Sequence, residues 1–227
     1  PLQQHIGAPC KPLVQKGDTV KAGQKIGEPV GFVSAAVHAS ISGKVVDVLP
    51  CIVANGTQVN AVVIDNDFQD TWVELHPVAD PENLNAKELA DLCREMGIVG
   101  MGGATFPTAV KLSVPEGKKV DTLVINGAEC EPYLSADHRL MLEKSEEIVQ
   151  GIEIVRRALS ISAVKIGIES NKPDAIERLT QLAVEYPHIE IVPLRVRYPQ
   201  GGEKQLIEAI TGREVPSGGL PIDVGAV

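Results

Sequence analysis

The segment from Gly97 to Gly103 holds four glycines in seven residues, and Phe106 and Lys111 follow it. Glycine has no Cβ, so its backbone can approach a phosphate or a flat ring, and its N–H groups can point at the ligand. The spacing departs from the dinucleotide motif G-x-G-x-x-G, because Thr105 stands where the third glycine would fall. The segment therefore indicates a nucleotide-binding loop, with a surface turn as the alternative.

Polar residues follow a short aliphatic run at 120–125 that is typical of a buried strand. Asn126, Glu129 and Glu131 stand directly after this run. Ligands of open α/β sheets bind at the carboxyl ends of the strands, so we expect these side chains to face the same crevice as the glycine loop. Two carboxylates and an amide suit the hydroxyl and amide groups of a nucleotide. A hydrogen-bonded turn is the alternative, since Asn, Gly and Pro are ordinary turn formers.

The composition is that of a globular protein with a core of its own, with 227 residues of which 44% are hydrophobic. A net charge of −9 and an aromatic content of 3% make nucleic acid an unexpected partner. No apolar run reaches the length of a membrane span, so we expect no direct membrane insertion. The four cysteines form no C-x-x-C pair, which favours free thiols and gives no support to a metal or cluster site.

The chain is expected to divide near Asp80. Residues 1–79 are rich in Val and Gly, with short alternating runs and turn signals such as Asn55-Gly56. This pattern resembles a barrel-sandwich hybrid, the fold of biotinyl and lipoyl carrier domains. A carrier needs a lysine on the central hairpin, and residues 29–38 contain none. The domain is therefore expected to be an unmodified relative of the carriers.

Helices and strands are expected to alternate over 80–227. Apolar periodicity predicts a helix that ends at Gly97, further helices from Ser145 and Pro173, and a helix that carries Leu206 and Ile210. Strands are predicted at 120–125, 163–168 and 189–194. Such alternation predicts an α/β fold, here a Rossmann-like domain with a mainly parallel sheet and covering helices.

A third polar loop, Tyr198-Pro-Gln-Gly-Gly-Glu-Lys204, stands between a predicted strand and the next helix. Taken alone, a Tyr-Pro turn with a Gly-Gly helix start is an ordinary structural element. Its position after a strand places it at the same edge of the sheet as Asn126 and Glu129.

Two motifs taken together resemble a known family. They are Gly-x-Gly-Gly-Ala-x-Phe-Pro-Thr-x-x-Lys at 100–111 and Asn-Gly-Ala-Glu-x-Glu-Pro at 126–132. The pair is similar to the 51-kDa flavin subunit of respiratory complex I and, more closely, to the C subunits of Rnf complexes. Rnf complexes are membrane-bound, ion-translocating ferredoxin:NAD oxidoreductases, and the resemblance to their C subunits spans Pro1 to Val227. The loop at Tyr198 resembles the Tyr-x-x-Gly-Glu-Glu segment beside the flavin, with Lys204 in place of the second acid.

The resemblance implies a role for each candidate residue, and it assigns none to catalysis because the redox chemistry belongs to the flavin. Gly100, Gly102 and Gly103 would line the path of the flavin and the nucleotide. Lys111, Asn126 and Glu129 would contact FMN, and the loop residues Tyr198, Gly201, Gly202 and Glu203 would close its far side. Phe106 would flank the dinucleotide, and Glu131 would bind NADH.

The implied function is an FMN-dependent module that exchanges hydride between NAD(H) and FMN within a membrane-associated electron-transfer complex. Electrons would pass to or from iron-sulfur clusters and, indirectly, a ferredoxin-type carrier. The family continues beyond the position of Val227 into a ubiquitin-like domain and a ferredoxin domain with two [4Fe-4S] clusters. This chain is expected to cover the first two domains, to be inactive alone, and to lie in the cytoplasm against the bacterial inner membrane.

Two other functions stay open at this point. A cobalamin reductase shares the same module and would serve corrinoid reduction. A non-catalytic scaffold would keep the fold without the chemistry, but it would have no reason to retain both the glycine-loop motif and the Glu-x-Glu-Pro motif.

Overall fold

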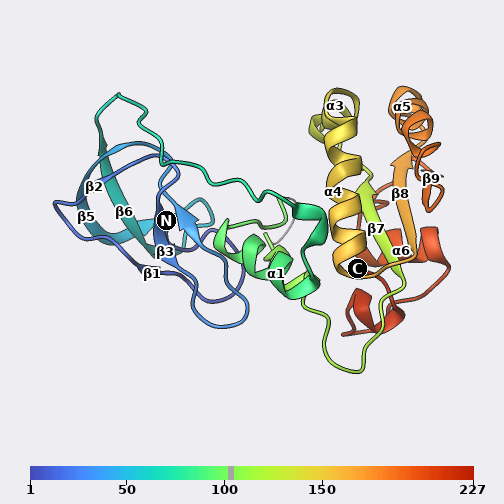
Figure 1. Cartoon of the computed structure of the whole chain (residues 1–227), viewed down its shortest axis with the longest axis horizontal. Helices are drawn as coiled ribbons and strands as arrows, with labels where there is room; N and C mark the ends of the chain where they lie inside the picture. Colours follow the sequence, from blue (N-terminus) through green and yellow to red (C-terminus); the bar gives the residue numbers. More distant parts are fainter. Residues whose placement is uncertain (102–104) are drawn as a thin grey trace. The chain divides into compact units, whose positions relative to one another are not determined.

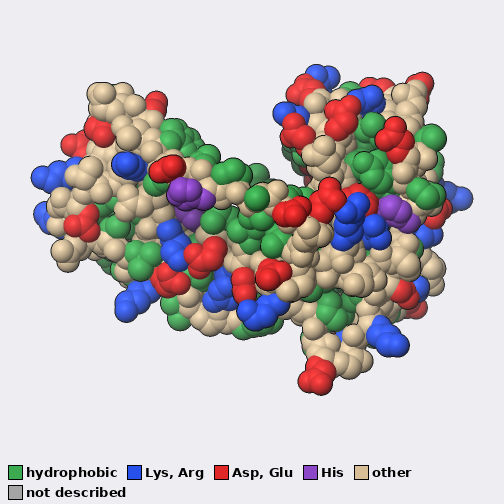
Figure 2. Space-filling view, viewed as in Figure 1, with side chains coloured by type: hydrophobic (Ala, Val, Ile, Leu, Met, Phe, Trp, Pro, Cys, Tyr) green, Lys and Arg blue, Asp and Glu red, His purple; other side chains and the backbone are tan. Residues whose placement is uncertain are grey.

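The computed structural model describes residues 1–101 and 105–227, so Gly102 and Gly103 lie outside the described residues. The chain forms two compact units, one of residues 1–79 and 87–113 and the other of residues 80–86 and 114–227. Within the described ranges, none of the helices has the length and apolar character needed to cross a membrane. On the face drawn in Figure 2, acidic and basic side chains are interspersed.

The first unit is built on two antiparallel sheets of three strands each, with the orders β1-β3-β4 and β2-β5-β6. Strands β5 and β6 pair over most of their length, and the turn between them is the predicted Asn55-Gly56 turn, in which Gly56 has a φ of +81°. Side chains from both sheets, including Val20, Ile26 and Val45, form a buried core. The strands are β1 (Lys11–Pro12), β2 (Thr19–Val20), β3 (Lys25–Glu28), β4 (Val37–His38), β5 (Gly43–Ile52) and β6 (Gln58–Asn66) (Figure 1).

Two helices complete the first unit, α1 (Ala86–Glu95), which begins at the unit's edge, and α2 (Thr108–Leu112). The chain turns out of the first helix at Gly97, whose φ of +70° is the left-handed conformation expected of a helix-ending glycine. The guanidinium of Arg94 donates hydrogen bonds to the backbone carbonyls of Gly31 and Phe32. These bonds tie α1 to the hairpin of the β unit, so this helix groups with the β strands although it follows Asp80. The domain boundary near Asp80 stays a prediction.

The second unit contains a parallel sheet of three strands in the order β7-β8-β9. Both predicted strands after residue 160 are present, the first one residue longer than expected and the second with the expected bounds. The elements are β7 (Thr122–Gly127), β8 (Ala163–Glu169), β9 (Ile189–Leu194), α3 (Ala136–Glu143), α4 (Ser145–Ala158), α5 (Pro173–Ala183), α6 (Glu203–Thr211), and the short 3-10 helices η1 (Pro81–Asn83) and η2 (Pro221–Val224). This arrangement confirms the predicted α/β class.

Helices cover both faces of the parallel sheet (Figure 1). Leu123 packs with Met141 of α3, Ile152 of α4 and Leu179 of α5, whereas its neighbour Val124 packs against α6. Successive side chains of a strand point to opposite faces, so three helices lie on one side of the sheet and α6 lies on the other.

A glycine in the central strand lets α6 approach the sheet. A Cβ built on Gly167 would lie 2.6 Å from Cδ1 of Ile210 on α6 and 2.9 Å from Cδ1 of Leu194. A larger residue here would force these side chains to move from their packed positions. Gly167 therefore allows the side chains of α6 to pack closely on the central strand.

Candidate functional site

Asn126 joins two of the predicted loops at the carboxyl edge of the parallel sheet. Its Oδ1 accepts a hydrogen bond from the backbone N–H of Ala128 at 3.1 Å, which shapes the loop after β7. Its Nδ2 donates to the backbone carbonyl of Gly201 at 2.9 Å, in the loop before α6. One side chain thus fixes the separation of segments 75 residues apart in sequence.

Gly201 makes a second set of contacts between the same loops. Its backbone N–H points at Sγ of Cys130, 3.4 Å away. A Cβ at this position would lie 3.0 Å from the carbonyl oxygen of Ala128, a tighter contact than most Cβ atoms make. The close approach of the two backbones therefore favours glycine here, and a side chain would force the loops slightly apart.

The remaining candidates of the third loop lie around the start of α6. Gly202 precedes the helix, and Glu203 is its first residue, where a carboxylate is favoured by the helix dipole. The phenol ring of Tyr198 is largely exposed, and the Tyr198–Pro199 peptide bond is cis. Nζ of Lys204 donates a hydrogen bond to the backbone carbonyl of Pro216, 3.0 Å away.

Glu129 is the buried candidate, with 8% of its surface exposed. Its two carboxylate oxygens accept hydrogen bonds from the backbone N–H groups of Asp137, at 2.8 Å, and His138, at 3.2 Å. These N–H groups belong to the first turn of α3, which has no other acceptor for them within the helix. Nζ of Lys172 lies 3.6 Å from the same carboxylate. Glu129 therefore anchors the start of α3, a role that the sequence did not suggest.

A cavity of about 300 Å³ opens beside these loops. Its lining combines three carboxylates, two cations and two tyrosines, namely Glu129, Glu131, Glu169, Lys172, Arg197, Tyr133 and Tyr198, with five further residues of the same loops. Glu131 is exposed. Tyr133 is fully exposed, and its backbone φ of +68° is one that residues other than glycine rarely adopt. Carboxylates and flat rings face one space, which suits a ligand with both hydroxyl groups and a ring.

Glu169 is the last residue of β8 and is completely buried, with 0% exposure. Neither carboxylate oxygen has a hydrogen-bond partner of good geometry among the residues that the structure describes, and the backbone of Arg197 makes only a weak contact with the carboxylate. Burial raises the pKa of Glu169, and the positive charge of Lys172 and the backbone contact with Arg197 oppose this shift. Sequence reasoning missed this residue because the strand was expected to end one residue earlier, at Ile168.

The other candidates belong to the first unit. The ends of the glycine loop are held together, since the N–H of Gly100 donates to the carbonyl of Phe106 at 2.9 Å. Phe106 is half-buried and Lys111 is exposed near the end of α2. Gly102 and Gly103 lie outside the described residues. The structure thus brings together seven candidates of the second unit, and a common site with the first-unit residues stays a prediction.

The cysteines are free, and burial raises the pKa of Cys10 and of Cys93. Within residues 1–101 and 105–227, no group of three or more His, Cys, Asp or Glu side chains could hold a metal ion.

Two known families match the chain. A family described as the Nuo51 FMN-binding domain matches residues 93–227, and the RnfC barrel sandwich hybrid domain matches residues 1–69. The second match confirms the barrel-sandwich prediction for the β unit. The first covers Gly100, Asn126, Gly201 and the other candidates, including those at the cavity.

Three curated proteins are similar over the whole chain or nearly so. The C subunit of the Na⁺-translocating ferredoxin:NAD⁺ oxidoreductase complex of Acetobacterium woodii is 51% identical over 100% of this chain and 52% of its own length. The proton-translocating counterpart of Clostridium ljungdahlii is 53% identical over 100% of this chain and 50% of that protein. The C subunit of an ion-translocating oxidoreductase complex of Pseudomonas aeruginosa is 48% identical over 99% of this chain and 29% of its own. The chain therefore spans about half the length of the first two relatives, and less of the third.

A solved structure shares the fold. A chain of an NAD⁺-reducing [NiFe]-hydrogenase in the H₂-reduced state aligns with a TM-score of 0.54 and 22% identity, over 65% of this chain and 29% of that one. At this identity the likeness concerns the architecture alone.

Proposed function

Because this chain belongs to the family of the Nuo51 FMN-binding domain, preceded by an RnfC barrel sandwich hybrid domain, we propose that it binds FMN and exchanges hydride with NAD(H). The observation that carries the proposal is the joining of two polar loops at the carboxyl edge of the sheet by Asn126 and Gly201. FMN, when bound, supplies the hydride chemistry, and the protein supplies binding and orientation.

The candidate residues of the second unit differ in how many hydrogen-bonding groups they have left for a ligand. Asn126 has both ends of its amide engaged, so its contribution is to hold the loops at a fixed separation. Glu131 is exposed at the cavity, so its carboxylate can accept a hydrogen bond from the amide of a nicotinamide. Glu129 anchors α3 with one lone pair on each oxygen, and a carboxylate retains further acceptor sites for a flavin.

The residues of the first unit enter the proposal through the family match, which covers the glycine loop. Gly100, Phe106 and Lys111 are proposed to contact FMN or the dinucleotide, as are Gly102 and Gly103. A glycine backbone leaves room for a phosphate or ring, an aromatic side chain stacks on a flat ring, and a lysine attracts phosphate.

The proposed setting is a membrane-associated electron-transfer complex on the cytoplasmic side of the bacterial inner membrane, in which this chain is part of one subunit. The names of the similar proteins support such a complex, with ferredoxin and NAD⁺ as its reactants. The proposal includes other subunits, a ferredoxin-type carrier reached indirectly, and two [4Fe-4S] clusters held outside this chain.

A matched pair of glycine substitutions tests the site. Gly201→Ala places a Cβ 3.0 Å from the carbonyl of Ala128, whereas Gly151→Ala on α4 places it in open space. We expect Gly201→Ala to weaken FMN binding at least tenfold in a fluorescence titration, with the circular dichroism spectrum unchanged. Gly151→Ala should bind FMN like the parent. Equal affinity for FMN in both variants would contradict the placement of the flavin at these loops.

A further inference from the structure

Glu169 stands out among the buried polar side chains. Both of its oxygens lack a hydrogen-bond partner within the described part of the chain, although the residue lies at the end of β8 with 0% exposure. A buried carboxylate whose oxygens lack well-formed hydrogen bonds destabilises a fold, because the interactions it makes do not replace the water it has lost. The presence of a carboxylate at this position is therefore better explained by ligand binding than by the stability of the fold.

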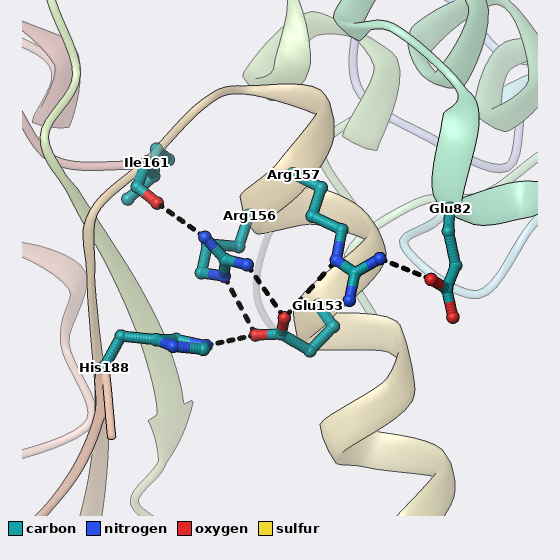
Figure 3. Close-up of polar contacts among 6 residues, drawn as sticks. All are labelled: Glu82, Glu153, Arg156, Arg157, Ile161 and His188. Atoms are coloured by element: carbon teal, nitrogen blue, oxygen red, sulfur yellow. Dashed lines mark hydrogen bonds and ion pairs between the residues drawn. The ribbon is translucent and has the colours of Figure 1, made fainter. Parts of the chain in front are cut away.

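A second buried carboxylate in the same unit shows the contrast. Glu153 on α4 accepts hydrogen bonds from Nε and Nη2 of Arg156, each at 2.9 Å, and contacts His188 and Arg157 as well (Figure 3). Its charge is fully compensated by the fold itself. Glu169 has no equivalent set of donors within the described residues, and Lys172, whose charge acts on it, forms its ion pair with Glu129 instead.

The surroundings of Glu169 indicate which ligand groups could donate hydrogen bonds to its carboxylate. The residue lines the cavity of about 300 Å³ together with Glu129, Glu131, Lys172 and Arg197. Three carboxylates against two cations disfavour a phosphate at this point, and one cation, Lys172, is already paired. Hydroxyl groups donate hydrogen bonds to carboxylates without adding negative charge. The exposed rings of Tyr133 and Tyr198 at the same cavity offer flat faces for an attached ring system.

We propose that this cavity binds the hydroxyl-bearing sugar chain of a nucleotide and that Glu169 accepts hydrogen bonds from its hydroxyl groups. An acid at the end of a strand in a parallel sheet is well placed for this contact. The inference rests on the proposed function and deepens it. Two sources carry the same chemistry, the ribityl chain of a flavin and the ribose of NADH.

The proposal predicts that substitutions of Glu169 lower ligand affinity without lowering the melting temperature. Replacing Glu169 removes a carboxylate that has no partner in the described fold, so Glu169→Gln and Glu169→Leu should keep or raise the melting temperature. The same variants should weaken the ligand at least tenfold, which is the loss of one charged hydrogen bond. Glu153→Gln is the control, and it should lower the melting temperature while leaving ligand affinity unchanged.

The experiment titrates the parent protein and the three variants with riboflavin, lumiflavin and NADH, and records thermal unfolding of each. Lumiflavin has the flavin ring without the ribityl chain. Weaker riboflavin binding with unchanged lumiflavin binding assigns the cavity to the ribityl chain, and weaker NADH binding alone assigns it to ribose.

Two outcomes overturn the inference while leaving the proposed function intact. One is unchanged affinity for riboflavin and NADH in both Glu169 variants. The other is a fall in melting temperature for Glu169→Gln as large as that for Glu153→Gln, which would make Glu169 a structural residue. Failure of the parent protein to bind riboflavin, FMN or NADH would overturn the proposed function and this inference together.

Discussion

The side-chain amide of Asn126 donates to the backbone carbonyl of Gly201, with Nδ2 and the oxygen 2.9 Å apart. The bond links the loop after β7 to the loop before α6. Because each loop follows a strand of the same parallel sheet, the bond lies at the edge where α/β sheets bind ligands. A single hydrogen bond therefore connects the fold to the proposed flavin site.

Replacing this amide tests the connection. Asn126→Leu keeps the approximate size of the side chain but removes its donor and its acceptor. We expect a loss of about 1 kcal/mol for each of the two hydrogen bonds in the free energy of unfolding. FMN affinity should fall as well, because the loops lose their fixed separation. Urea unfolding and FMN titration measure the two effects, and full affinity in a destabilised variant would separate the loop contact from the site.

Glu131 tests the proposed contact with the dinucleotide. The side chain is exposed, so Glu131→Gln should leave the free energy of unfolding within about 0.5 kcal/mol of the parent. NADH binding should weaken by about 1.5 to 3 kcal/mol, while FMN binding changes little. Calorimetric titration with each ligand checks this, and Glu177→Gln on the exposed face of α5 is the control. An equal loss of both ligands would assign Glu131 a structural role.

Glu153 predicts a pH dependence of stability. Burial opposes the ionisation of this carboxyl, but hydrogen bonds from Arg156 and His188 outweigh it and lower its pKa from 4.5 to about 2. A carboxyl whose pKa is depressed by folding stabilises the protein above pH 4.5 and loses this contribution as the pH falls towards 2. The contribution is on the order of 3 kcal/mol. Urea unfolding between these pH values should show the loss in the parent and a much flatter profile in Glu153→Gln, and parallel profiles would contradict the assignment.

Gly167 tests the packing of α6 on the sheet. Its Cβ would lie 2.6 Å from Cδ1 of Ile210, so Gly167→Ala should destabilise the protein by about 1 to 3 kcal/mol. Gly151→Ala, with nothing near its Cβ, should be neutral or stabilising. Urea unfolding of the two variants gives the comparison, and equal stability would mean that α6 does not pack as closely as described.

Much of the fold could be predicted from the sequence, since strand and helix signals were strong where side chains are buried on one face. The strand at 189–194 has its expected bounds, and α4 begins at Ser145 as predicted. Helix α3 was missed, because Met141 is its one fully buried side chain and the apolar periodicity is weak. The sequence also placed Asn126 and Gly201 in loops at one edge of the sheet, and the structure joins these loops, while their role in binding stays a prediction.

Other features depend on tertiary contacts that no local pattern encodes. Glu129 anchors a helix that starts several residues later, and this role follows from how the loop returns to α3. Glu169 looks like an ordinary strand end, and its burial without well-formed hydrogen bonds to the described residues depends on the tertiary fold. The grouping of α1 with the β unit depends on Arg94 and two carbonyls more than 60 residues away, beyond the reach of local periodicity.

The central claim is that the protein binds FMN and exchanges hydride between it and NAD(H). Because the chain alone is expected to be inactive, the most direct measurement is an anaerobic absorbance spectrum of the full-length, FMN-loaded protein before and after addition of NADH. We expect the visible flavin band to bleach on NADH addition and to return on addition of an oxidant, with a much smaller change in Glu131→Gln. A flavin band that stays unchanged with bound FMN and excess NADH would contradict the account.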